Sequence, residues 1–153
     1  MAGQRMLEIL RKGALFSRIK SRLYSLIERK HSAMSVTHKE AMKWFEHRKA
    51  GYEELISAIH PYVKQDSVIF DVGANVGYFS YLLAENIDFE GSLYLFEPLP
   101  NLAKLCEETF QGSTYEAKVF NYGLSDEDSE VDIFVASNGN LGWNTIVQSK
   151  ASD

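Results

Sequence analysis

A short glycine-containing segment, followed by one acidic residue further along, is the part of this sequence best suited to chemistry. The segment reads Asp71-Val-Gly-Ala-Asn-Val-Gly77, and Glu97 stands 20 residues after its last glycine. Glycines let the backbone approach a ligand with no side chain in the way. A carboxylate at the end of a neighbouring strand can accept hydrogen bonds from both hydroxyls of a ribose. Together these features predict a site for an adenosine-containing cofactor.

Short apolar runs and helical runs alternate around this segment, and they would position it. Strands are predicted at 67–72, 92–96 and 118–122, and helices at 78–84 and 101–110. A strand–helix–strand–helix–strand order with short connections predicts an α/β fold with a parallel sheet and right-handed crossovers. The glycine segment then lies at the carboxyl edge of the sheet, where open α/β folds bind ligands.

The residues of the glycine segment also distinguish between cofactors. A dinucleotide fingerprint needs glycines where this sequence has Asn75 and Tyr78, and no Gly-Lys-Ser/Thr string of a phosphate-binding loop occurs. Asp71 would repel a pyrophosphate and attract a cation, and S-adenosylmethionine carries a sulfonium and an ammonium group. The electrostatics therefore favour S-adenosylmethionine over NAD or ATP.

Three strings resemble the FkbM-type methyltransferases, which are class I, S-adenosylmethionine-dependent enzymes that mostly methylate hydroxyl groups of sugars or natural products. The strings are Asp71-Val-Gly-Ala-Asn-Val-Gly-Tyr-Phe-Ser80, Leu95-Phe-Glu-Pro98 and Leu124-Ser-Asp126. The resemblance covers residues 55–147. It implies a Rossmann-like half-sheet of strand order 3-2-1, and an acceptor that is a small-molecule or glycan hydroxyl.

The resemblance also implies which residues bind the cofactor, by their positions in the shared strings. The implied residues are Asp71, Gly73, Ala74, Asn75 and Gly77 at the methionine end, Glu97 at the ribose and Asp126 near the adenine. Asp126 lies in an acidic run, and a turn or helix-cap role suits it equally well. Tyr78 and Phe96 are expected to serve core packing. The sequence indicates no catalytic base and no metal ligands.

The charge changes sign along the chain. Residues 1–30 carry eight Lys/Arg against two Glu, whereas residues 67–153 carry three Lys against fourteen Asp/Glu. The acidic part argues against a nucleic-acid partner, because it would repel phosphates. The basic part has apolar residues at three- and four-residue steps, which predicts an amphipathic helix over residues 4–30. We expect this helix to pack on the domain, with peripheral contact to an anionic membrane as the alternative.

The remaining N-terminal residues are predicted to form a linker over 31–37 and a second helix over 38–59, which Pro61 ends. We accordingly divide the chain into a helical extension, residues 1–60, and a cofactor-binding domain, residues 61–153. No apolar run is long enough to span a bilayer, and one cysteine cannot form an internal disulfide. A cytoplasmic protein, with membrane association as the alternative, is expected.

The C-terminal part is predicted to differ from a complete methyltransferase sheet. A β-hairpin is expected over residues 131–147, in place of the further strands that the resemblance implies. We therefore expect a truncated cofactor-binding half that is inactive alone and that self-associates through the open edge of its first strand. The alternative is a non-catalytic remnant or an interaction protein that uses the basic helix.

Overall fold

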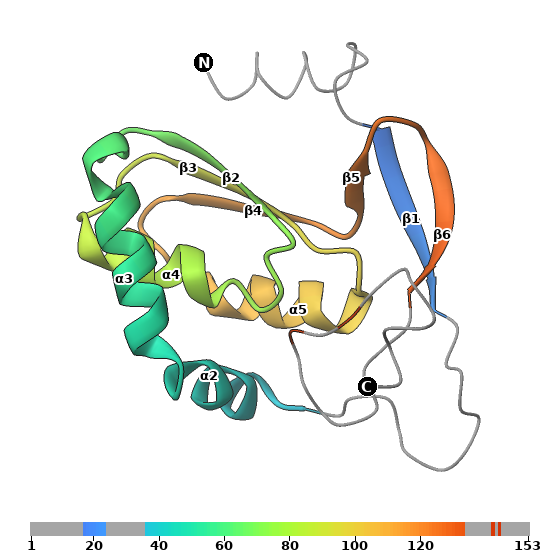
Figure 1. The fold of residues 1–153 in the computed structure, drawn as a ribbon, viewed down its shortest axis with the longest axis horizontal. Coiled ribbons are helices and arrows are strands. Elements are labelled where there is room, and N and C mark those ends of the chain that lie inside the picture. Colours follow the sequence, from blue (N-terminus) through green and yellow to red (C-terminus); the bar gives the residue numbers. More distant parts are fainter. Residues whose placement is uncertain (1–16, 24–35, 134–141, 143, 145–153) are drawn as a thin grey trace.

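The computed structural model describes residues 17–23, 36–133, 142 and 144. These residues form two three-stranded sheets and a set of helices (Figure 1). The elements are β1 (Ser17–Leu23), α2 (His38–Glu46), α3 (Lys49–Ile59), the 3-10 turn η1 (His60–Tyr62), β2 (Val68–Val72), α4 (Tyr78–Asn86), β3 (Ser92–Phe96), α5 (Pro100–Thr109), β4 (Glu116–Phe120), β5 (Gly123–Ser125) and β6 (Ser129–Ile133).

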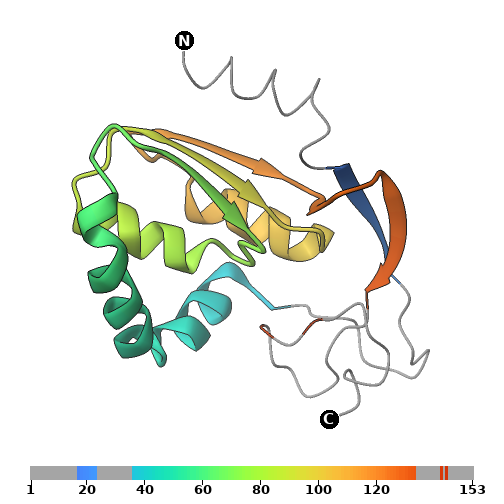
Figure 2. The same ribbon diagram turned by 45° about the horizontal axis from the view of Figure 1, so that its top comes forward.

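The larger sheet is parallel, and β3 lies between β2 and β4. The connections α4 and α5 lie on the same face of this sheet in both views (Figures 1 and 2). This confirms the predicted α/β class and the strand order 3-2-1. The third strand begins and ends two residues earlier than predicted, at Glu116 and Phe120.

The alternation of side chains along the strands gives the sheet two different faces. Leu93 and Leu95 of β3 pack with Cys106 of α5 and with Phe110, the residue directly after α5, in one buried cluster. The intervening residues of β3 point to the other face, where aromatic rings stack from strand to strand. The centroid of Phe96 lies 6.0 Å from that of Phe70 in β2 and 5.0 Å from that of Phe120 in β4.

Helices α2 and α3 replace the single helix predicted over 38–59. Helix α2 begins with a capping box between Thr37 and Glu40. The helix is interrupted at Arg48, whose φ of −110° and ψ of 8° are not helical. The Arg48 guanidinium folds back to lie 3.6 Å from the centre of the Trp44 ring. The chain changes direction at Arg48, and this change lets Ile56 of α3 enter the same buried cluster as Phe45 of α2.

The helices α2 and α3 share one core with the sheet domain. Phe45 and Ile56 belong to the same buried cluster as Leu83 and Leu102 of α4 and α5. Residues from both sides of position 60 therefore contribute to one buried cluster.

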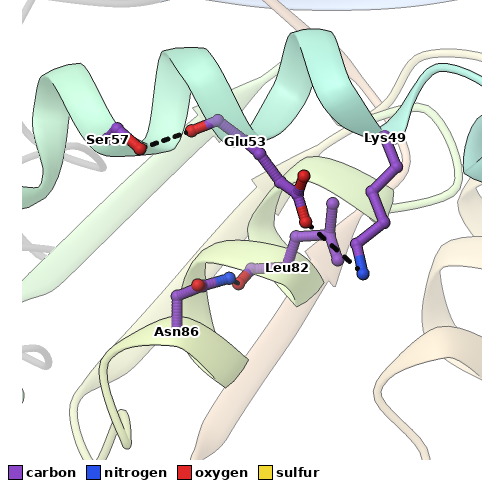
Figure 3. Close-up of polar contacts among 5 residues, drawn as sticks. All are labelled: Lys49, Glu53, Ser57, Leu82 and Asn86. Atoms are coloured by element: carbon purple, nitrogen blue, oxygen red, sulfur yellow. Dashed lines mark hydrogen bonds and ion pairs between the residues drawn. The ribbon is translucent and has the colours of Figure 1, made fainter.

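Figure 3 shows polar contacts within α3 and within α4. Lys49 pairs with Glu53 at 3.5 Å, and the hydroxyl of Ser57 donates to the Glu53 carbonyl at 2.8 Å. In α4, Asn86 donates to the carbonyl of Leu82 at 2.7 Å. An exposed pair of this kind contributes little to stability, so α3 is held mainly by its buried side.

The second sheet overturns part of the prediction for the N-terminal segment. Residues 17–23 form β1 and not a helix; the rest of the predicted helix over 4–30 lies outside the described residues. Basic residues alternate in this stretch with period two, which suits a strand as well as the three- and four-residue steps suit a helix. Strand β1 pairs in parallel with β6, and the register sets Lys20 opposite Glu130 and Arg22 opposite Asp132.

The first arm of the hairpin predicted over 131–147 appears as β6, which begins two residues earlier, at Ser129, and belongs to this second sheet. The second arm of the predicted hairpin, residues 143–147, lies outside the described residues apart from Asn144. In the described part of the chain, no helix combines the length and apolar character needed to cross a bilayer. The same part of the chain holds no group of His, Cys, Asp or Glu suited to a metal ion.

Candidate functional site

The predicted site residues gather where two parallel strands end side by side. Asp71 is the second-to-last residue of β2, and residues 73–77 connect β2 to α4. Glu97 directly follows β3, whose last residue, Phe96, is in register with Val72. The carboxyl edge of the sheet therefore brings the glycine loop and Glu97 together, as the sequence predicted.

The two glycines of the loop serve different purposes. Both have positive φ, 82° at Gly73 and 76° at Gly77, a region that favours glycine. A Cβ added at Gly73 would meet nothing within 4 Å, so this side of the loop is open. A Cβ at Gly77 would lie 2.5 Å from Phe110 Cε2 and 2.9 Å from Cys106 Sγ. Gly73 therefore leaves open space beside the loop, whereas Gly77 lets α4 pack closely on α5.

All five backbone N–H groups of residues 73–77 donate hydrogen bonds within the protein. Those of residues 73 and 74 donate to the Phe96 carbonyl at 2.9 and 3.1 Å, and that of residue 75 donates to Glu97 Oε2 at 2.9 Å. The last two donate to Asn75 Oδ1 at 2.9 Å and to the Ala74 carbonyl at 2.7 Å. A phosphate group at this loop would compete with these internal bonds, unlike at the free amides of phosphate-binding loops.

Glu97 is a buried acid that ties two loops together. Its side chain is 5% exposed. Oε2 accepts from the Asn75 N–H and Oε1 accepts from the Leu99 N–H, each at 2.9 Å. Burial raises the pKa of Glu97; the two amides lower it, and nearby Asp71 raises it further. Each oxygen keeps a second lone pair, so Glu97 can still accept a ligand hydroxyl.

Asp71 presents a half-satisfied carboxylate at the same edge. Its Oδ2 accepts a 2.6 Å hydrogen bond from the hydroxyl of Ser80, which is fully buried in α4. Its Oδ1 has no hydrogen-bond partner in the described residues. Burial raises the pKa of Asp71, and the bond from Ser80 lowers it. A positively charged ligand group beside Oδ1 would therefore be attracted, and an anion repelled.

The end of the third strand supplies a residue that the sequence reasoning missed. Asn121 directly follows β4, and its Nδ2 donates to the carbonyls of Glu97 at 2.9 Å and Pro98 at 3.0 Å. Asp126 comes after β5, is exposed, and accepts from the Ser125 hydroxyl at 3.1 Å. These hydrogen bonds thus join Asn121, and not Asp126, to the Glu97 turn. The prediction missed it because the third strand was expected to run to residue 122, which put Asn121 inside the strand and not directly after it.

Thr109 at the end of α5 was also missed, and it forms a hydrogen bond with the glycine loop. Its hydroxyl lies 2.6 Å from the Val76 carbonyl and 2.9 Å from His38 Nε2 of α2. The α2 helix is thereby tied to the loop that carries the candidate site. Contacts between residues this distant in sequence leave no local pattern.

Comparison with known proteins gives one structural likeness. No family model matches the chain, and no curated protein matches it. A solved structure described as geranyl diphosphate methyltransferase in complex with GPP and sinefungin is similar, with a TM-score of 0.41 and 16% sequence identity. The match covers 75% of this chain and 42% of that one, so this chain spans less than half the length of that protein.

Proposed function

We propose that this chain binds S-adenosylmethionine and provides the cofactor-binding part of a methyltransferase. The observation that carries the proposal is the edge formed by the open side of Gly73, the free oxygen of Asp71 and a loop whose amides are all used internally. This edge suits a cationic ligand and not a phosphate-bearing one.

The residues present fit this cofactor. The free Oδ1 of Asp71 would hold the ammonium group, and the remaining lone pairs of Glu97 would accept the ribose hydroxyls. Either Asn121 or Asp126 would contact the adenine. When bound, S-adenosylmethionine supplies a methyl group on a positively charged sulfur. The residues of this chain bind and orient it, and such positioning is the main source of rate in a displacement of this kind.

We further propose a hydroxyl group of a sugar or natural product as the methyl acceptor. The support is the resemblance of Asp71–Ser80, Leu95–Pro98 and Leu124–Asp126 to the FkbM-type enzymes. Methyl transfer from labelled S-adenosylmethionine to a panel of sugar and small-molecule alcohols tests this acceptor class. Transfer to amines or thiols alone would contradict it.

Calorimetric titration of the full chain tests cofactor binding. We expect S-adenosylhomocysteine to bind more tightly than NAD or ATP. Asp71→Asn should weaken that binding about tenfold, because a charged hydrogen bond is lost. Asp66→Asn is the matched control, since Asp66 is exposed and precedes β2 at the opposite edge of the sheet. Tighter binding of NAD or ATP, or equal effects of the two variants, would overturn the proposal.

A further inference from the structure

Tyr52 brings α3 to the edge where the candidate site lies. Its ring centroid is 5.6 Å from that of Tyr78 and 6.2 Å from that of Phe79, the first two residues of α4. It also lies 6.2 Å from the ring of Phe45 in α2. Because Tyr78 directly follows Gly77, the ring of Tyr52 packs beside the end of the glycine loop.

The hydroxyl of Tyr52 is not used by the fold. The side chain is half-buried, and in the described part of the chain its hydroxyl has no hydrogen-bond partner. Burial raises the pKa of Tyr52; Arg48 lowers it, and Asp71 raises it. The geometry agrees with this: the ring of Tyr52 contacts Phe79, and the next residue, Ser80, donates the hydrogen bond to Asp71.

The site as described lacks a donor for one part of the proposed ligand. The amino-acid end of S-adenosylmethionine carries an ammonium, which Asp71 can hold, and a carboxylate, which needs hydrogen-bond donors. The five amides of residues 73–77 are already committed to acceptors within the protein. The Tyr52 ring packs on Tyr78 and Phe79, directly after this loop, and its hydroxyl has no hydrogen-bond partner among the described residues, so it is available as a donor.

We infer that Tyr52 is a further binding residue of this site and that its hydroxyl donates a hydrogen bond to the carboxylate at the amino-acid end of the ligand. The inference rests on the proposed function. It makes α3 part of the binding site, in addition to its contribution to the core. A tyrosine that only packed in the core would use its ring and leave the hydroxyl without consequence.

Two ligands that differ at the amino-acid end separate these roles. S-adenosylhomocysteine has this end, and 5′-methylthioadenosine lacks it. For Tyr52→Phe in the full chain, we expect calorimetry to show about five- to tenfold weaker binding of S-adenosylhomocysteine and a change within about twofold for 5′-methylthioadenosine. The matched control is Tyr62→Phe, whose ring in η1 is 85% exposed. It should leave both affinities unchanged.

The outcomes distinguish this inference from the proposed function. A parallel loss of affinity for both ligands in Tyr52→Phe would assign Tyr52 a purely structural role and overturn the inference. Unchanged affinity for both would overturn it as well, and neither result would affect the proposed function. Failure of the unaltered chain to bind either ligand would overturn the proposed function, and the inference with it.

Discussion

The carboxylate of Glu97 accepts a 2.9 Å hydrogen bond from the backbone N–H of Asn75, which joins the end of β3 to the loop that follows β2. Its other oxygen accepts from the Leu99 N–H, so one buried acid fixes both connections at this edge. A ligand hydroxyl would have to share these oxygens with the amides. The residue predicted to bind the ribose is therefore also a structural anchor of the site.

Replacing Glu97 should accordingly destabilise the fold. In Glu97→Ala, two amides lose their acceptor in a buried setting, and we expect the free energy of unfolding to fall by about 2–4 kcal/mol. Urea denaturation measures it. Glu107→Ala, an exposed change on α5, should lie within about 0.5 kcal/mol of the unaltered chain. A Glu97→Ala chain of undiminished stability would show that the two amides find other acceptors.

Asp71 should make stability depend on pH. Burial raises the pKa of Asp71 in the folded chain above its ordinary value, so the folded state binds a proton more readily than the unfolded state. The resulting stabilisation is complete below the unfolded pKa and is lost as the pH rises through the folded pKa. Asp71→Asn removes this titration while retaining an acceptor for Ser80. We therefore expect the variant to be more stable than the unaltered chain at neutral pH.

The difference between Asp71→Asn and the unaltered chain should shrink towards acid, which urea denaturation between about pH 4 and about pH 8 would show. The control Asp66→Asn, an exposed change, should leave the free energy of unfolding within about 0.5 kcal/mol of the unaltered chain. Lower stability of Asp71→Asn at neutral pH would mean that the bond to Ser80 outweighs the cost of burying the charge.

The glycines of the loop allow the cost of backbone conformation to be separated from the cost of packing. Both have positive φ, so alanine is strained by about 1–2 kcal/mol at either position. Only at Gly77 would the added Cβ also collide with Phe110 and Cys106. We expect Gly73→Ala to lose about 1–2 kcal/mol of unfolding free energy and Gly77→Ala about 2–5 kcal/mol. Equal losses would show that α5 moves away without cost.

The sequence predicted the larger sheet well because its signals are local. Apolar runs of strand length, bounded by glycine or by Glu97-Pro98, leave little choice of structure, and β2 and β3 agree with the prediction to within one residue. The break at Arg48 had no such signal. The position of the break depends on the contact of Arg48 with Trp44 and on the packing of Phe45 and Ile56 in one core.

The errors have a common cause in long-range pairing. The segment 17–23 fits both helical and strand periodicity, and its partner β6 lies more than a hundred residues away in the sequence. The glycine segment and its spacing to Glu97 placed Glu97 and Asp71 at the site, but they could not show that Glu97 binds loop amides or that Tyr52 packs on Tyr78 and Phe79. Such contacts exist only after the helices have packed.

The edge of β2 should promote self-association. Strand β2 pairs with β3 on one side, and in the described residues no strand pairs with its other side. Val68 is 38% exposed and Val72 58% exposed on this strand. Exposed apolar edges tend to pair with another chain, and a lysine on the edge opposes this. We therefore expect sedimentation velocity to show concentration-dependent association of the unaltered chain, and we expect Val68→Lys to reduce it.

Leu55→Lys is the control for this prediction, because Leu55 is 50% exposed and lies on α3, not on strand β2. If both variants reduced association equally, general apolar exposure and not pairing at the β2 edge would be its cause, and a monomeric unaltered chain at all concentrations would show that the edge does not associate.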